Sequence, residues 1–193
     1  MATPNATRHE DVLRVLDTVR TIQHTVDVAR LERIWSIYRS WINVHGLEGG
    51  TGLTRDELAC VLECPDDDTQ LDFLLTTFGT SERVDLLTLL ITAACVARGS
   101  LTEKARLLFR LVDFDVEDEI VEDELVLIVA SCMHGLYRLG VVSSDVSDAD
   151  ARAIAYEAFE FVGVDDGSKM PLSQFIKWMV AHPRPRALFE RLQ

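Results

Sequence analysis

The stretch that decides the fold is Asp113-Phe114-Asp115-Val116-Glu117-Asp118-Glu119-Ile120-Val121-Glu122-Asp123-Glu124, residues 113–124. Eight of its twelve side chains are carboxylates. They occupy every second position from Asp113 to Glu119, with Asp118 added, and resume at Glu122 after the apolar Ile120 and Val121. Carboxylates so close together repel one another, and a hard divalent cation would relieve that repulsion.

Residues 113–124 match the spacing of a calcium-binding loop. Such a loop has twelve residues, offers oxygen ligands at positions 1, 3, 5, 7, 9 and 12, and turns sharply at position 6. Position 8 is apolar and bridges to a second loop. With Asp113 at position 1, the sequence predicts one Ca²⁺ site whose ligands are Asp113, Asp115, Glu117, Glu119 and Glu124. Asp118 stands at position 6, where a positive φ favours glycine, although Asp tolerates it better than most residues. The alternative is a solvated acidic loop retained for its turn and its bridge.

Three more segments keep the apolar bridging residue but lose most of the acidic ligands. Glu57 reaches position 12 of the first loop, but it also completes the capping box Thr54-Arg55-Asp56-Glu57, to which we assign it. The second and fourth loops keep only Asp85 and Asp165. Because such loops bridge in pairs, the pattern predicts two pairs of helix-loop-helix units. Their bridging residues are Leu53, Val84, Ile120 and Met170.

Apolar residues recur at helical spacing through most of the chain, which predicts an all-α fold. Capping signals at Ser100-Leu101-Thr102-Glu103 and at Ser147 with Asp150 open two of the helices. The expected organisation is four helix-loop-helix units in two paired lobes, with an extra N-terminal helix. Its parts are an extension over residues 1–25, a first pair over 26–98, a second pair over 99–182 and a tail helix over 183–193. The tail could dock on an acidic partner, fold into its own groove, or cover the core as a plain terminal helix.

The charge of the chain excludes some partners. With 32 Asp and Glu against 19 Lys and Arg, the net charge is −13. Such a surface repels phosphate backbones and anionic lipid headgroups over about a Debye length. We therefore expect no nucleic-acid partner, and a cation or a basic partner segment instead. A charge that serves only solubility is the alternative.

The cysteines and the N-terminus bear on location. The four cysteines lie in apolar stretches without a CxxC pair, which predicts buried free thiols in a reducing, cytoplasmic compartment. The N-terminus lacks a signal pattern, and Ala2 stands where N-myristoylation requires glycine, so no membrane anchor is expected. The longest apolar run, 86–97, is too short to cross a bilayer as a helix. The four cysteines are Cys60, Cys64, Cys95 and Cys132.

The sequence favours a protein that is not an enzyme. It contains no GxSxG, Walker A, HExxH or dinucleotide-binding motif. Its five histidines are scattered and have no neighbouring nucleophile.

From about Leu31 to the C-terminus, the chain resembles the neuronal calcium sensor and calcineurin B-like branch of the EF-hand superfamily. The segment Arg98-Gly99-Ser100-Leu101-Thr102-Glu103-Lys104 resembles the opening of the third unit in that branch, and is similar to that of calaxin-type ciliary sensors of outer dynein arms. Members clasp an amphipathic helix of a target protein in an apolar groove. The resemblance implies the same binding mode here, in a cytoskeletal or axonemal assembly. Aromatic residues on the apolar faces of the first two units are the candidate groove residues, unless they are plain core: Trp35, Tyr38, Trp41, Phe73 and Phe78.

Two functional hypotheses follow. The first is a constitutive structural subunit in which degenerate loops hold the helices around a permanent partner. The second is a calcium-responsive sensor that uses the third loop to control binding of a target helix. They differ in whether Ca²⁺ controls the binding of the partner.

Overall fold

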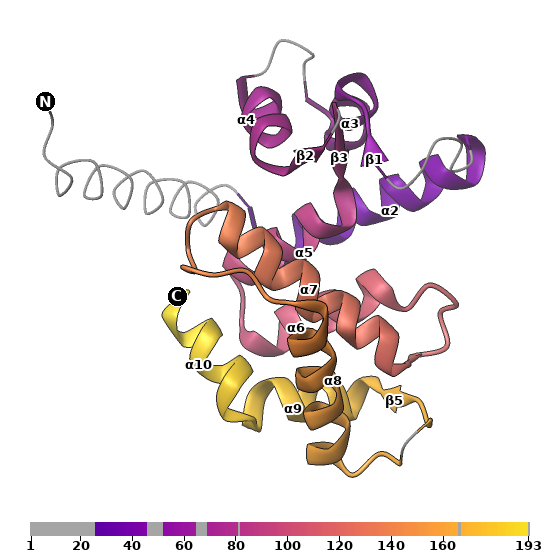
Figure 1. The fold of residues 1–193 in the computed structure, drawn as a ribbon. Coiled ribbons are helices and arrows are strands. Elements are labelled where there is room, and N and C mark those ends of the chain that lie inside the picture. The colour runs from indigo at the N-terminus through magenta and orange to yellow at the C-terminus, as the bar shows by residue number, and fades with distance from the viewer. Residues whose placement is uncertain (1–25, 46–51, 65–68, 81, 166, 193) are drawn as a thin grey trace, which may run out of the picture.

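The computed structural model describes residues 26–45, 52–64, 69–80, 82–165 and 167–192 (Figure 1). Helices dominate these residues, so the predicted all-α class is confirmed. The predicted extension over 1–25 lies outside the described residues. The helices are α2 (Val28–His45), α3 (Arg55–Leu62), α4 (Thr69–Phe78), α5 (Leu86–Val96), α6 (Leu101–Val112), α7 (Glu122–Arg138), α8 (Asp148–Val162), α9 (Leu172–Ala181) and α10 (Pro183–Arg191).

Two small antiparallel sheets join the loops in pairs. In the first, β1 (Gly52–Leu53) pairs with β3 (Arg83–Asp85), which also pairs with β2 (Gly79–Thr80). In the second, β4 (Glu119–Ile120) pairs with β5 (Met170–Pro171). The registers set Leu53 opposite Val84 and Ile120 opposite Met170, which are the two pairs expected from the sequence. All four side chains are buried, with at most 2% of their surface exposed.

Side-chain caps begin several helices where the sequence predicts them. At α3, Thr54 Oγ1 accepts a hydrogen bond from Glu57 N (3.4 Å), and Glu57 Oε2 accepts one from Thr54 N (2.7 Å). Ser100 and Glu103 make the same reciprocal pair of bonds at α6. At α8, Ser147 Oγ accepts from Asp150 N. These bonds satisfy backbone donors that the first helical turn leaves without a partner.

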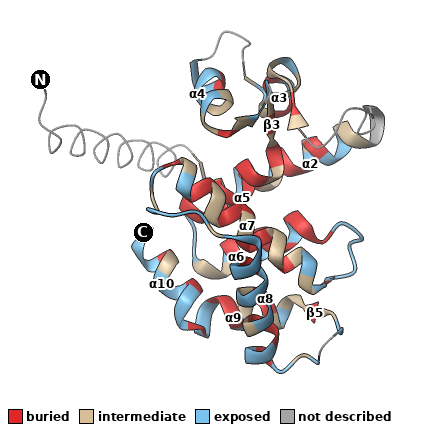
Figure 2. Cartoon of the chain, in the orientation of Figure 1, coloured by how far each residue is buried: buried red, intermediate tan, exposed pale blue. Residues whose placement is uncertain are grey.

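The helices pack around one continuous core (Figure 2). Helix α5 lies against α2, α6 and α7, while α7 packs on α8 and α6 packs on α9. The predicted boundary near residue 98 falls in the short break between α5 and α6, and the core continues across it. The contact of α5 with α7 thereby joins the predicted first pair of units to the predicted second pair. None of the described helices is both long and apolar enough to span a bilayer.

The tail helix α10 folds back onto the body of the protein. It packs against α9, and Phe189 and Leu192 are buried with 3% and 5% of their surfaces exposed. His182 precedes it, and its Nδ1 accepts a hydrogen bond from Arg184 N (3.3 Å). This arrangement agrees with the third expectation for the tail, a terminal helix that covers the core.

One expectation about the thiols is wrong. Cys95 and Cys132 are buried and lie in contact, with 3.2 Å between their sulfur atoms. Cys60 is exposed, however, and Cys64 is only partly buried. Helix α3 is only two turns long and buries one side, with Leu58, Ala59 and Val61, so Cys60 on the other side stays in solvent.

Candidate functional site

The third loop follows α6 and carries all the predicted metal ligands. Asp113 lies at its start and has only 5% of its surface exposed. Its carboxylate accepts hydrogen bonds from the backbone N–H groups of Glu117 (3.1 Å) and Asp118 (3.2 Å). Asp118 has φ of +57°, so it takes the left-handed conformation that position 6 of such a loop requires. The hydrogen bonds to Asp113 thus support the turn of the loop, although position 6 carries Asp118 and not glycine.

A lysine from the fourth loop contacts the middle of this acidic loop. Lys169 directly precedes β5, and its Nζ lies 3.3 Å from Asp115 Oδ2 and also bonds to Glu117 Oε2. The hydrogen bond to Glu117, together with the bond to Asp115 and both negative charges, raises the pKa of Lys169 to about 12. Partial desolvation raises the pKa of Asp115, but the hydrogen bond from Lys169 and further hydrogen bonds outweigh it, so the net shift is downward. Lys169 is therefore the counter-ion of two predicted calcium ligands.

The remaining predicted ligands are placed differently. Glu124 Oε2 accepts a hydrogen bond from Val121 N (2.9 Å), so its carboxylate caps α7. Glu119 is exposed and belongs to β4. In the part of the chain that the structure describes, no cluster of three or more His, Cys, Asp or Glu side chains is arranged to hold a metal ion.

The carboxylates of the other loops mostly serve the fold. Besides its capping bonds, Glu57 Oε2 lies 3.3 Å from Arg83 Nη2. Asp85 caps α5 by accepting hydrogen bonds from the N–H groups of Leu87 and Thr88. Asp165 is exposed in the fourth loop. Residues 46–51, with most of the first loop, lie outside the described residues.

The candidate groove residues lie mainly in the core. Trp35, Tyr38 and Phe78 have 9%, 5% and 3% of their surfaces exposed, Trp41 is partly buried, and only Phe73 is exposed, at 41%. Burial, reinforced by the charges of nearby acidic groups, raises the pKa of Tyr38. The buried indole Nε1 of Trp35 has no hydrogen-bond partner among the described residues. A partner could reach the three buried rings only if the helices of the first pair moved apart.

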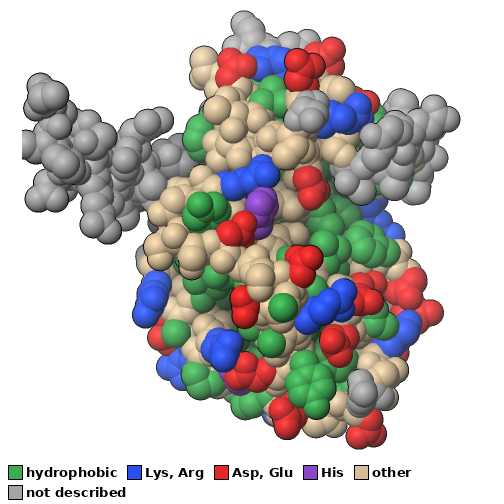
Figure 3. All heavy atoms as spheres, viewed as in Figure 1, with side chains coloured by type: hydrophobic (Ala, Val, Ile, Leu, Met, Phe, Trp, Pro, Cys, Tyr) green, Lys and Arg blue, Asp and Glu red, His purple; other side chains and the backbone are tan. Residues whose placement is uncertain are grey.

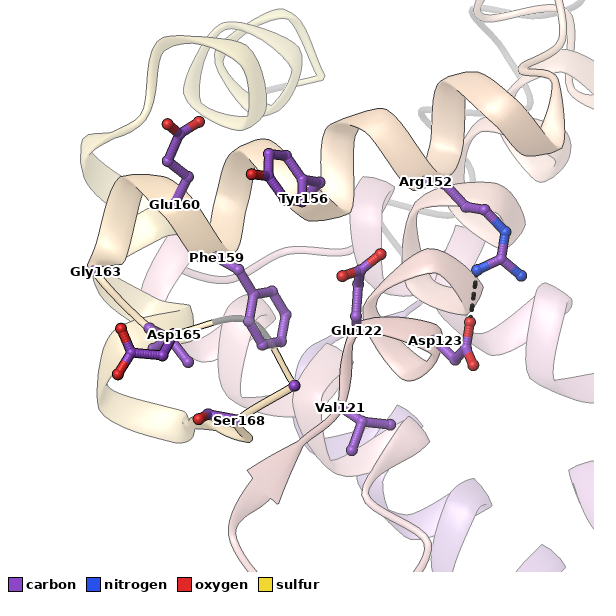
Figure 4. Close-up of a pocket in the computed structure, with 12 residues that line it drawn as sticks. Val121, Glu122, Asp123, Arg152, Tyr156, Phe159, Glu160, Gly163, Asp165 and Ser168 are labelled. Atoms are coloured by element: carbon purple, nitrogen blue, oxygen red, sulfur yellow. Dashed lines mark hydrogen bonds and ion pairs between the residues drawn. The ribbon is translucent and has the colours of Figure 1, made fainter.

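A cavity of about 640 Å³ lies between the start of α7, the end of α8 and the fourth loop (Figure 4). Apolar surface comes from Val121, Tyr156 and Phe159. Tyr156 is 57% exposed and Val121 38%, so both belong to the exposed large apolar side chains of the described residues. The cavity is therefore open to a ligand that brings its own apolar group.

Acidic groups surround the cavity: Glu122, Asp123, Glu160 and Asp165. Its single basic group, Arg152, is held by Asp123 at 2.7 Å, which leaves the cavity with a net negative charge. Figure 4 shows Glu122 and Phe159 on facing walls, one from α7 and the other from α8. On the face drawn in Figure 3, apolar, acidic and basic side chains are mixed over the lower part of the molecule around α8.

A second cavity of about 680 Å³ occupies the corresponding place in the first pair of units. It lies between the start of α3, the end of α4 and the second loop, and Thr76 lines it. Arg55 and Arg83 balance its acidic groups, Asp56 and Glu82. The two cavities thus differ in charge although they occupy equivalent places.

Sequence reasoning missed the acidic cavity. Its walls come from residues 121–123 and from residues between 152 and 168, which are distant in the sequence, and only their packing brings them together. Tyr156 was the available signal, because its ring lies off the buried stripe of α8. No protein-family model matches the chain, and no curated protein matches it.

Proposed function

We propose that the protein is a non-catalytic, EF-hand-like subunit that binds a partner protein largely independently of Ca²⁺. The observation that carries this proposal is the pairing of the loops through Leu53 with Val84 and Ile120 with Met170. This pairing supports the four helix-loop-helix units that the resemblance to calcium sensors implies. The acidic groups of the loops serve mainly as caps and ion pairs, which supports a constitutive role.

The acidic cavity is the proposed binding surface. Tyr156 and Val121 offer exposed apolar area, and Glu122 and Asp165 add negative charge beside it. Aromatic side chains in such positions often contribute most of the binding energy of an interface. A complementary partner segment carries an apolar side chain flanked by Lys or Arg, because opposite charges steer association and suppress wrong partners.

The proposal also includes the cellular location of the protein. The free cysteines support a reducing, cytoplasmic location. The resemblance to calaxin-type sensors supports a cytoskeletal or axonemal assembly as the place where the subunit works.

The first test is crosslinking with mass spectrometry in native extract. A tagged full-length chain is incubated in parallel with Ca²⁺ and with a chelator, and the partner and the crosslinked positions are identified. We expect the same partner in both samples, with crosslinks close to α8 and the start of α7. A partner that is lost on chelation contradicts the constitutive role.

Variants then test the surface with the identified partner. Tyr156→Ala and Glu122→Gln should each weaken binding by about tenfold, because each removes an apolar or charged group that lines the cavity. Thr76→Ala, in the corresponding cavity of the first pair, is the matched control and should bind normally. Unchanged affinity of both cavity variants would contradict the proposed surface.

The alternative is a calcium-responsive sensor that uses the third loop. The left-handed conformation of Asp118 and the two bonds that the Asp113 carboxylate accepts favour it, since both belong to the geometry of a calcium loop. A sensor predicts one calorimetric Ca²⁺ site with a dissociation constant of about 10⁻⁷ to 10⁻⁵ M, abolished by Glu124→Gln. Absence of heat at millimolar Ca²⁺ would contradict it.

A further inference from the structure

We propose that Lys169 is a built-in cation for the third loop, which holds the acidic residues together without a metal ion and competes with Ca²⁺ for their oxygens. This inference rests on the proposed EF-hand-like pairing. It adds the reason why one acidic loop with a calcium-like backbone would stay insensitive to Ca²⁺.

The position of Lys169 follows from the pairing of the loops. Its neighbour Met170 pairs with Ile120, so the register of β4 and β5 brings the lysine across from the acidic loop. From there its Nζ lies 3.3 Å from Asp115 Oδ2 and also bonds Glu117 Oε2. Asp115 and Glu117 are 54 and 52 positions away in the sequence, so this contact depends on the fold.

The loop in this arrangement does not fit Ca²⁺. The ion requires six to eight oxygen ligands at about 2.3–2.6 Å. Lys169 engages the carboxylates at positions 3 and 5, while Glu124, which would supply two oxygens at position 12, caps Val121 N. Binding would therefore require displacement of the lysine and rotation of Glu124.

A tethered ammonium is an effective competitor for these oxygens. Each exposed ion pair contributes little to stability, because water screens it and the side chain loses freedom. Lys169 can nevertheless compete with Ca²⁺ for the carboxylate oxygens, because the chain holds its ammonium group beside the loop at a high effective concentration. A Ca²⁺ ion entering the loop would also meet the positive charge of the lysine at short range.

The test compares Ca²⁺ binding by full-length variants in calorimetry. Lys169→Met removes the charge and keeps a similar chain length, so we expect one Ca²⁺ site with a dissociation constant at least about tenfold lower than that of the unmodified protein. Lys177→Met, at an exposed position in α9, removes the same charge away from the loop and should leave Ca²⁺ affinity unchanged. Adding Glu117→Gln to Lys169→Met should reverse the gain.

Equal Ca²⁺ affinity in Lys169→Met and the unmodified protein would overturn the inference, and so would an equal gain in Lys177→Met. Lys169→Gln repeats the test with a polar replacement, and circular dichroism checks that each variant is folded. Partner crosslinking, measured separately, decides the proposed function. The partner can remain bound when the lysine hypothesis fails, and the gain in Ca²⁺ affinity can appear when no partner binds.

Discussion

Lys104 carries a charge into the core, with only 1% of its surface exposed. Its Nζ donates a hydrogen bond to the backbone oxygen of Cys95 (2.9 Å) and lies 5.6 Å from the ring centroid of Phe189. The last carbonyls of a helix have no partner within it and carry partial negative charge, so an ammonium at the end of α5 is stabilising. One side chain thereby ties α5, α6 and α10 together.

The burial of Lys104 should appear in the pH dependence of stability. Desolvation lowers the pKa of Lys104, although the charge of nearby Cys95 opposes the shift. The folded protein therefore binds this proton less tightly than the unfolded chain, so the contribution of Lys104 to the free energy of unfolding should rise as the pH approaches 10.5, the ordinary value for lysine. The buried Cys95 thiol, whose pKa is raised by its hydrogen bond with Cys132 and by burial, contributes in the opposite direction. Each unit by which the pKa is lowered corresponds to about 1.4 kcal/mol.

Urea unfolding at a series of pH values checks this expectation. Lys104→Met fills similar space without a charge, so its stability should rise less with pH than that of the unmodified protein. Lys177→Met is the exposed control and should keep the full rise. Identical slopes for the unmodified protein and Lys104→Met would contradict the argument.

At the scale of elements, the start of α6 depends on a few local bonds. Ser100 Oγ accepts from Glu103 N at 3.2 Å, and Glu103 Oε2 accepts from Ser100 N at 2.7 Å. These partners are three residues apart, which is why the sequence alone predicts the cap. Hydrogen bonds from the backbone and the side chain of Ser100 lower the pKa of Glu103, so its carboxylate is charged at neutral pH.

Removal of this cap should destabilise the protein moderately. Ser100→Ala should lower the free energy of unfolding by about 1 kcal/mol, because the N–H of Glu103 loses its acceptor. Ser144→Ala, in the exposed segment between α7 and α8, is the control and should change stability little. Urea denaturation of the three proteins measures the difference, and equal effects of the two substitutions would refute the role of the cap.

At the scale of the whole molecule, the packing of α5 on α7 joins the N-terminal and C-terminal halves of the described chain (Figure 1). The helices approach closely at Gly135, where an added Cβ would lie 1.6 Å from Thr92 Oγ1. Cys95 and Cys132 meet at the same interface. The interface therefore requires a residue without a side chain at position 135.

Gly135→Ala should therefore separate α5 from α7. Alanine in a helix normally stabilises by about 0.5–1 kcal/mol relative to glycine, but here overpacking should dominate and destabilise by about 1–3 kcal/mol. Thermal unfolding should show a lower midpoint for Gly135→Ala. The double variant Thr92→Ala/Gly135→Ala should recover part of the loss, and additivity of the two single effects would contradict the proposed clash.

Local patterns predicted much of the fold and part of the candidate site. The caps at Thr54 and Ser100 and the bridging residues at the centres of the loops all occupy their expected places. The left-handed conformation of Asp118 was the expected consequence of its place in the loop. The exposure of Cys60 was not anticipated, because an apolar neighbourhood in sequence does not reveal which side of a short helix is covered.

What the sequence by itself determined about this protein is the order of its helices, their caps and the pairing of its loops. The helices and their caps depend on hydrogen bonds and apolar periodicity between near neighbours, which a linear pattern records directly. The pairing of the loops joins distant segments, and the sequence signals it by an apolar residue at the same place in each loop. Only the tertiary structure decided that Lys169 pairs with Asp115 and Glu117, that Trp35 lies in the core and that Tyr156 borders an acidic cavity. These outcomes depend on which distant segments pack together, because only that packing determines which residues contact a charged side chain or an aromatic ring.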